Sequence, residues 1–255
     1  MSSANGYRLP RFNAAEYFVD RHLEEGRGQR VAIECGDHRI TYAQLNERVN
    51  RFGSGLREKL GVRMEERVLL LLPDIPEFAY CFFGAIKVGA VPVPVNTLLR
   101  VNEYEYLLND TRARIAVVSG SLAPLILQIP RERLEFLREV IVVSAAGGAQ
   151  QNTISLAHLL ASGSDRLVAA PTCGDDDAFW LYSSGSTGFP KGCVHLQHDM
   201  VFATEQYASK VLEIHESDRF FSAAKLFFAY GLGNALYFPL AVGGTSILCP
   251  DPPSP

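Results

Sequence analysis

Val68-Leu-Leu-Leu-Leu72-Pro-Asp-Ile-Pro76 joins a short apolar run to a proline that can begin a helix. A continuous run of apolar residues is typical of a strand that is buried on both faces, as in a parallel sheet. Proline suits the first turn of a helix, and an apolar stretch from Phe78 to Val88 follows it here, before Gly89. The segment therefore predicts a buried parallel strand followed by a helix.

Similar signals alternate along the chain on both sides of this segment. Thr41-Tyr-Ala-Gln44 fits a capping box and opens an amphipathic helix that ends at Gly61. Further strands are expected at 91–95, 115–118, 140–143, 179–182, 219–223 and 246–249, and further helices at 102–109, 154–161 and 199–212. This alternation predicts an α/β fold with mostly parallel sheets flanked by helices. A polar connection from residue 144 onward marks a candidate subdivision near 144–178.

The composition narrows the classes of function. The 255 residues are 47% hydrophobic and 20% charged, which is typical of a globular protein and not of a disordered one. The formal net charge is −4 and no basic block occurs, so we expect no nucleic-acid partner. Five cysteines, odd in number and without a CxxC pair, argue against a disulfide framework and a zinc site. No signal peptide and no apolar run of about 18 residues is found, which predicts a cytoplasmic protein without a membrane partner.

One loop concentrates the groups that bind phosphate. Tyr182-Ser-Ser-Gly-Ser-Thr-Gly-Phe-Pro-Lys-Gly192 combines hydroxyl side chains, glycines and a lysine directly after an apolar strand. Glycines let the backbone turn sharply and present N–H groups, hydroxyls add donors, and Lys191 adds positive charge. The Walker pattern does not fit, because Pro190 precedes the lysine and Gly192 follows it. The alternative is a flexible Gly/Ser surface loop.

This ordered spacing resembles the AMP-binding signature of the adenylate-forming superfamily, which comprises acyl- and aryl-CoA synthetases, peptide synthetase adenylation domains and luciferases. Segments 40–45, 73–78 and 83–94 also resemble landmarks of that family. The segment Lys225-Leu-Phe-Phe-Ala-Tyr-Gly-Leu-Gly-Asn234 is similar to the benzoate-CoA ligase branch. Phe228 stands where many plant-type aryl ligases have a histidine, so their substrates are not transferred directly.

The resemblance implies a two-step reaction. A carboxylate attacks MgATP to give an acyl-adenylate and pyrophosphate, and coenzyme A then displaces AMP. The residues expected to bind the β- and γ-phosphates are Ser183, Ser184, Gly185, Ser186, Thr187 and Gly188. Thr187, also a candidate near Mg²⁺, and Lys191, which would steady the loop or the leaving group, are the candidate catalytic residues. No residue is assigned as a metal ligand.

The aromatic-rich stretch 220–238 has two interpretations. Aromatic residues dominate protein cores, so core packing explains most of them. By resemblance, Phe228, Ala229, Tyr230 and Gly231 line a flat slot for an aryl ring, with benzoate or a substituted benzoate as the small-molecule substrate.

Other polar residues carry weaker signals. His195 and His198 could share a helix face, but no carboxylate or cysteine completes a ligand set, which favours a surface or capping role over a metal or acid–base pair. Asp175-Asp-Asp177 is more typical of a solvated turn than of a cation site. Gly231-Leu-Gly233-Asn-Ala-Leu236 lacks the third glycine of a dinucleotide fingerprint, which argues against a nicotinamide enzyme.

Three elements that the resemblance implies do not occur before Pro255: a Tyr-Gly-x-Thr-Glu motif, an aspartate for the ribose and a lysine from a mobile C-terminal domain. We therefore expect residues 1–255 to be the first part of the large N-terminal AMP-binding domain, without the C-terminal domain and nearly inactive alone. Two alternatives stay open: a ligase for a medium-chain or alicyclic acid, and a non-catalytic nucleotide-binding or interaction module. The sequence does not predict the oligomeric state.

Overall fold

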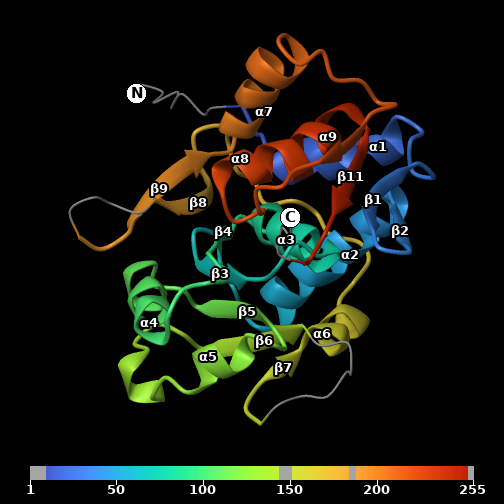
Figure 1. The fold of residues 1–255 in the computed structure, drawn as a ribbon. Helices are drawn as coiled ribbons and strands as arrows, with labels where there is room; N and C mark the ends of the chain where they lie inside the picture. The colour runs from blue at the N-terminus through green and yellow to red at the C-terminus, as the bar shows by residue number, and fades with distance from the viewer. Residues whose placement is uncertain (1–9, 144–150, 184–187, 252–255) are drawn as a thin grey trace, which may run out of the picture.

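The computed structural model describes residues 10–143, 151–183 and 188–251 (Figure 1). Its strands are β1 (Val31–Cys35), β2 (His38–Thr41), β3 (Arg67–Leu71), β4 (Val91–Pro94), β5 (Ile115–Ser119), β6 (Glu139–Val143), β7 (Ile154–Ser155), β8 (Asp177–Ser183), β9 (Lys191–Leu196), β10 (Arg219–Phe221) and β11 (Thr245–Leu248). Its α-helices are α1 (Arg21–Glu24), α2 (Tyr42–Ser54), α3 (Pro76–Lys87), α4 (Val101–Asp110), α5 (Ala123–Leu127), α6 (Leu156–Ser162), α7 (Asp199–Ala203), α8 (Ala229–Leu232) and α9 (Phe238–Val242). Shorter helical turns are η1 (Glu16–Asp20), η2 (Gly55–Lys59), η3 (Arg131–Arg133), η4 (Thr204–Ser209) and η5 (Gly233–Tyr237).

A parallel sheet with the strand order β4-β3-β5-β6-β7 forms the centre of the fold. Along β3, Val68 and Leu70 pack with α2 and α3, whereas Leu69 and Leu71 pack with α4 and α5 on the other face. Successive side chains of a strand point to opposite faces, so an all-apolar strand needs helices on both sides. The expectation of an α/β fold with mostly parallel sheets and flanking helices is confirmed.

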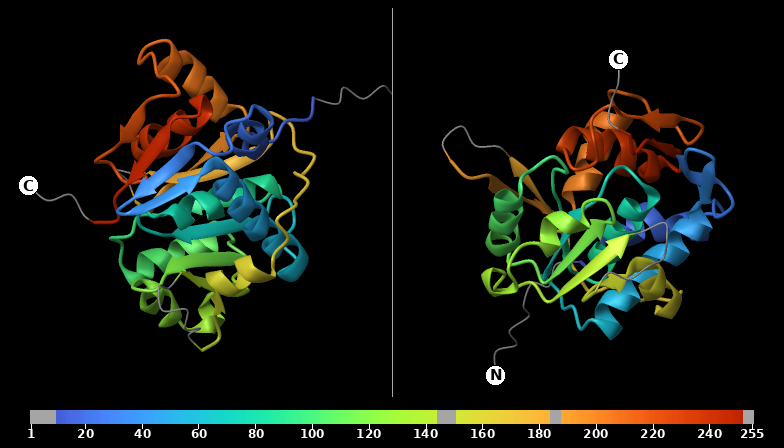
Figure 2. Two further views of the ribbon diagram at one scale, coloured as in Figure 1. Left: turned by 90° about the vertical axis from the view of Figure 1, so that its right-hand side faces the viewer. Right: turned by 60° about the horizontal axis from the view of Figure 1, so that its bottom comes forward.

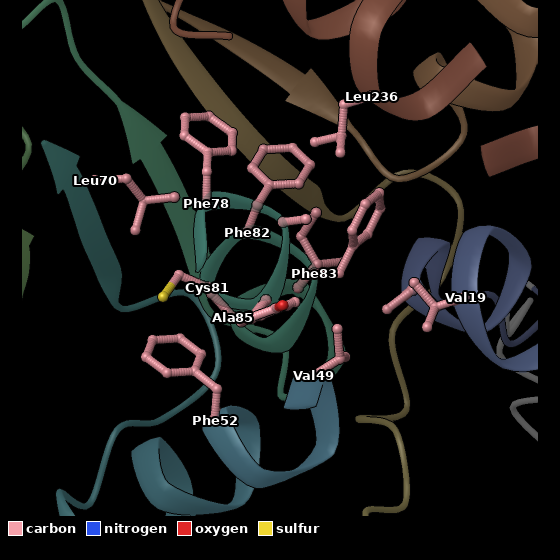
Figure 3. Packing of buried hydrophobic residues seen from close by; sticks show 14 of the residues in the cluster. Val19, Val49, Phe52, Leu70, Phe78, Cys81, Phe82, Phe83, Ala85 and Leu236 are labelled. Atoms are coloured by element: carbon pink, nitrogen blue, oxygen red, sulfur yellow. The ribbon is translucent and has the colours of Figure 1, made fainter. Parts of the chain in front are cut away.

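Helices α2 and α3 cross closely over one face of this sheet (Figure 3). A Cβ atom added at Gly53 would lie 2.8 Å from the carbonyl oxygen of Gly84, and one added at Gly84 would lie 2.9 Å from that of Val49. Any larger side chain at these glycines would push the two helices apart. The apolar side chains of α3, among them Phe78, then fill the space between the helices and the sheet.

The predicted helix signals act as expected. The Thr41 side chain accepts from the N–H of Gln44, the Gln44 side chain accepts from the N–H of Thr41, and the capping box that opens α2 is confirmed. Pro76 occupies the first turn of α3, and Gly89 follows this helix with a φ of +76°. Both termini are therefore fixed by local chemistry.

A second sheet joins the two ends of the described chain. Its order is β10-β11-β1-β2, with β11 parallel to both β10 and β1, and β2 antiparallel to β1. Figure 2 shows this sheet stacked against the half of the molecule that holds the parallel sheet. Strands β1 and β2 lack an isolated apolar run and are not predicted from the sequence.

A third, two-stranded sheet is the antiparallel hairpin β8–β9, whose strand β8 also packs beside β4. We expected a strand at 179–182 but not its partner, because β9 is an exposed strand with polar residues. The expectation of one helix over 154–161 is wrong at its start, since residues 154 and 155 pair with β6 before α6 begins. Among the described residues, no helix is both long and apolar enough to cross a membrane.

Candidate active site

The β8–β9 hairpin joins the two ends of the predicted phosphate loop. Ser183 and Lys191 are direct partners across the hairpin, so a hydroxyl and an ammonium group stand side by side where the loop begins and ends. Gly188 has a φ of +143°, a backbone conformation that only glycine adopts easily. The predicted phosphate-binding residues Ser184, Gly185, Ser186 and Thr187 lie outside the described residues.

The hairpin has two different faces, because paired residues of an antiparallel ladder share a side. One face carries Leu181 with Cys193 and Ser183 with Lys191, and the opposite face carries Tyr182 with Gly192. The first face lines two neighbouring cavities, and the second face turns towards α4. We call the face that carries Leu181 and Ser183 the pocket face.

Two cavities lie against the pocket face. The first, here called the slot cavity, measures about 320 Å³ and is lined by Leu181, Tyr182, Ser183, Cys193, His195, Phe227, Phe228 and Ala229. The second, here called the side cavity, measures about 220 Å³ and is lined by Phe179, Leu181, His195, Asp199, Met200, Phe202, Ala203, Ala229, Leu232 and Tyr237. Leu181, His195 and Ala229 belong to both, so the two cavities are adjacent.

A larger hollow of about 710 Å³ lies elsewhere, along α5, η3 and β6. None of the predicted phosphate-binding or slot residues lines it. Volume alone does not make a site, so the slot cavity, where predicted residues converge, is the better candidate.

The predicted slot residues separate into two pairs. Phe228 and Ala229 line the slot cavity, which Ser183 also lines. Tyr230 is 69% exposed and lines neither cavity, and Gly231 is buried. A Cβ added at Gly231 would lie 2.2 Å from the carbonyl oxygen of Lys225, so this glycine is required by a close approach of the chain's own backbone.

Asp74 contacts the segment that precedes α8. This aspartate is 3% exposed and accepts from the backbone N–H of Leu226 at 3.0 Å, and burial raises the pKa of its carboxyl group. The Lys225 ammonium lies 3.8 Å from Asp74 and also donates to the carbonyl oxygens of Cys249 and Asp251. Together these contacts fix the backbone that carries Phe228 into the slot cavity.

His195 lines both cavities, although the sequence favoured a surface or capping role for it. Its ring stacks on Phe179 with centroids 4.5 Å apart, and its Nδ1 lies 3.5 Å from Asp199 Oδ2. His195 belongs to β9 and His198 follows that strand, so the shared helix face that the sequence allowed does not form. The sequence signal for this contact was Asp199, whose carboxylate follows His195 by four residues.

The remaining polar residues form local contacts at the surface. His198 lies 3.3 Å from Asp175, and Asp176 accepts from the N–H of Cys173. Asp177 begins β8 and accepts from the indole N–H of Trp180. In the part of the chain that the structure describes, no group of three or more His, Cys, Asp or Glu side chains could hold a metal ion.

The sequence of the chain matches one known family. The model of the family described as "AMP-binding enzyme" matches residues 19–255. The chain belongs to this family. Its phosphate-loop signature, parallel sheet and β8–β9 hairpin are therefore interpreted within that family.

Named relatives point to one branch of the family. The chain is 49% identical to a benzoate–CoA ligase of Thauera aromatica over 245 residues, which cover 96% of this chain and 45% of the relative. It is 43% identical to a 4-hydroxybenzoate–CoA/benzoate–CoA ligase of Rhodopseudomonas palustris, over 95% of this chain and 44% of the relative. The chain thus spans about half the length of the curated relatives that it matches.

Solved structures give the same result for the fold. An anthranilate CoA ligase in complex with anthranoyl-AMP superposes with a TM-score of 0.90 at 37% identity, over 98% of this chain and 47% of that structure. A benzoate CoA ligase from Burkholderia xenovorans superposes with a TM-score of 0.84 at 41% identity, over 95% and 46%. The resemblance to the adenylate-forming superfamily and its benzoate-CoA ligase branch is confirmed.

Proposed function

We propose that the protein activates an aromatic carboxylic acid, benzoate or a substituted benzoate, with ATP and transfers the acyl group to coenzyme A. One observation carries this proposal. Ser183, where the phosphate loop begins, and the slot residues Phe228 and Ala229 line the same cavity. An aromatic acid whose ring binds in this cavity would have its carboxylate beside the phosphates of ATP. The names of the relatives support the class of acid.

The chemistry requires two anions to meet. A carboxylate oxygen attacks the α-phosphorus of ATP, the bond to the leaving pyrophosphate breaks, and the sulfur of coenzyme A then attacks the acyl carbon and releases AMP. Positioning and electrostatic stabilisation must supply most of the rate enhancement. Lys191 is exposed, stands beside Ser183 and forms no ion pair with another described residue, so its charge is available to the phosphates.

When bound, Mg²⁺ would neutralise charge on the phosphates. Mg²⁺ commonly binds through substrate phosphates and one or two protein groups and not through a full protein cage. Thr187, the candidate near the metal, lies outside the described residues.

The walls of the slot cavity suit an aryl ring. Leu181 and Phe227 are buried and apolar, and Phe228 is half exposed.

We further propose that residues 1–255 form the first part of a larger AMP-binding domain, with a candidate subdivision near 144–178. The protein is proposed to act in the cytoplasm, on small molecules and not on nucleic acid. The coverage of the relatives and the spacing of the cysteines support these proposals.

Ligand binding is the direct test for the 255-residue chain. Pyrophosphate exchange is expected to be weak or absent, because the three later elements of the family do not occur in this sequence. MgATP and benzoate should both bind, measured by calorimetry and by fluorescence of Trp180, the single tryptophan, which lies on β8. Lys191→Ala should weaken MgATP binding, whereas Ala229→Phe should weaken benzoate binding only.

The matched control is Lys210→Ala, which removes an exposed lysine of another segment, whose ammonium donates to Gln206. Failure of the unaltered chain to bind MgATP, or equal binding by Lys191→Ala, would overturn the proposal. A panel with cyclohexanecarboxylate and octanoate separates an aromatic acid from the alicyclic and medium-chain alternatives.

A further inference from the structure

Helix α4 presents one side to the core and another to the hairpin. Tyr104, Leu107 and Leu108 are buried, at the spacing of one helix face. Tyr106 and Asp110, four residues apart, share a different side. Figure 1 and the right-hand view of Figure 2 show α4 beside the β8–β9 hairpin.

Tyr106 contacts the arm of the hairpin that follows the phosphate loop. Its ring stacks on Phe189, with centroids 4.7 Å apart and planes 21° from parallel. Its hydroxyl donates to the carbonyl oxygen of Pro190 at 3.2 Å. Because Phe189 is 72% exposed, it is held by this stack and not by the core.

Asp110 contacts the arm that precedes the loop. It accepts from the Tyr182 hydroxyl at 2.5 Å. The Tyr182 ring lies across Gly192, where an added Cβ would be 3.3 Å from it. Burial and the adjacent Asp110 carboxylate raise the pKa of Tyr182, so the hydroxyl stays protonated and remains a donor.

The C-terminal end of α4 is itself anchored to the parallel sheet. Arg67 of β3 donates from Nε to the carbonyl oxygen of Thr111, the residue that caps α4, at 2.6 Å. The same guanidinium lies over the ring of Trp180 in β8, 5.6 Å from its centroid. One arginine of the parallel sheet therefore contacts both the C-terminal end of α4 and the hairpin strand β8.

We propose that α4 is a clamp that holds the two arms of the phosphate loop at a set separation through Tyr106 and Asp110. These two are positioning residues: they touch the hairpin and not the phosphates. Groups that are ordered before binding cost less free energy when the ligand binds. The clamp thus prepares Ser183, Gly188 and Lys191 for a triphosphate. Only the identity of the ligand rests on the proposed function.

The test uses three variants of the 255-residue chain and one matched control. Tyr182→Phe removes the hydroxyl that Asp110 accepts from, Tyr106→Leu removes the stack and the Pro190 contact, and Tyr106→Phe keeps the stack alone. Tyr104→Phe is the control. It removes a hydroxyl of the same helix whose hydrogen-bond partners are the backbone carbonyl oxygen of Asn96, at 2.9 Å, and the N–H of Leu99, at 3.2 Å, and not residues of the hairpin.

Two measurements are made on each variant. Amide hydrogen exchange without nucleotide reports the order of peptides that cover residues 178–196. Calorimetry with Mg²⁺–tripolyphosphate and with adenosine separates phosphate binding from binding of the nucleoside. A loss of overall stability would weaken both ligands and would also follow from Tyr104→Phe.

We expect faster exchange in both hairpin arms and roughly tenfold weaker tripolyphosphate binding for Tyr182→Phe and Tyr106→Leu, because each variant frees one arm of the hairpin from α4 and that arm must then be ordered on binding. Adenosine binding should not change, and Tyr106→Phe should recover most of the affinity. Unchanged exchange and affinity in the first two variants, or equal effects from Tyr104→Phe, would overturn the clamp. If the unaltered chain bound no tripolyphosphate, the proposed function would fail, and the exchange comparison would still decide the clamp.

Discussion

His22 is a buried imidazole whose protonation state is set by its two neighbours. Nε2 lies 2.6 Å from the carbonyl oxygen of Leu240, and Nδ1 accepts from Arg27 Nε at 2.8 Å. A ring that accepts at Nδ1 and donates at Nε2 is neutral. Burial lowers the pKa of His22 to about 4.

This pKa predicts a stability loss in acid. The unfolded chain takes up a proton on this histidine near pH 6.5, while the folded chain does so only near pH 4, so stability falls as the pH drops between these values. From pH 7.5 to 4.5 the loss from this group is about 2 kcal/mol. In urea unfolding series, His22→Gln should lose less free energy over this interval than the unaltered chain. Parallel curves would contradict the prediction.

Ser246 illustrates the opposite case, a buried polar atom without compensation. The residue is fully buried in β11, and its Oγ has no hydrogen-bond partner among the described residues. A buried hydroxyl without a partner is destabilising. Ser246→Ala should therefore keep or raise the free energy of unfolding, by up to about 1 kcal/mol. A loss above that size in thermal or urea unfolding would show that the hydroxyl is bound.

The candidate site was predictable only where one residue carries its own signal. Ser183 and Lys191 follow from the loop sequence, whereas Phe228 and Ala229 were expected from the resemblance of segment 225–234 to the benzoate-CoA ligase branch. His195 was missed because its place beside both cavities depends on β9, a strand that exists only through its pairing with β8. Side-chain chemistry is local, but a cavity wall depends on tertiary structure.

At the scale of elements, Lys87 ties three helical segments together. This lysine at the end of α3 is 2% exposed, and its ammonium lies 2.6 Å from both Asp20 of η1 and Asn50 of α2. Asn46 also donates to Asp20, at 2.7 Å. Burial raises the pKa of Asp20, and the adjacent Lys87 counteracts that rise. The network fixes the N-terminal helical segment against α2 and α3.

Substitutions that break this network should lower the free energy of unfolding more than a substitution of an exposed residue does. Lys87→Met leaves the Asp20 carboxylate without its cation, and removing one partner of a buried pair typically costs about 3 kcal/mol. Adding Asp20→Asn should recover part of this loss, which a double-mutant cycle measures. Lys59→Met, at an exposed lysine of η2, serves as the control and should change stability by less than about 0.5 kcal/mol. Additive single effects would contradict the coupling.

Elements with strong local signals were predictable and elements that depend on distant partners were not. The capping box of α2, the proline of α3 and the apolar runs of β3, β5 and β6 each fix their own element. Strands β1, β2 and β9 are partly exposed. Their extended form comes from pairing, which no local window of sequence contains.

At the scale of the whole molecule, β11 is the strand on which the second sheet depends. It lies between β10 and β1, so its backbone is paired on both sides. Ser246 stands opposite both Ile33 and Phe220. The first and last described strands of the molecule therefore stabilise one another.

Ser246→Pro tests this dependence. Proline removes a ladder N–H and is not tolerated in a central strand, so we expect a loss of at least about 3 kcal/mol. Near-ultraviolet circular dichroism and protease resistance of the segment around β1 should both decline. Ser246→Ala is the matched control, since it keeps the backbone N–H. A cooperative unfolding transition at the original temperature in Ser246→Pro would contradict this role.

The pairing of β1 with β11 also has a consequence for biosynthesis. Roughly two hundred residues separate the two strands in sequence, so at about 5 to 20 residues per second a ribosome needs about 10 to 40 seconds between them. During that interval the nascent chain exposes one unpaired strand edge, to which chaperones or neighbouring polysomes have access. Synonymous codon changes that slow elongation before residue 245 should therefore lower the soluble yield without altering the finished protein.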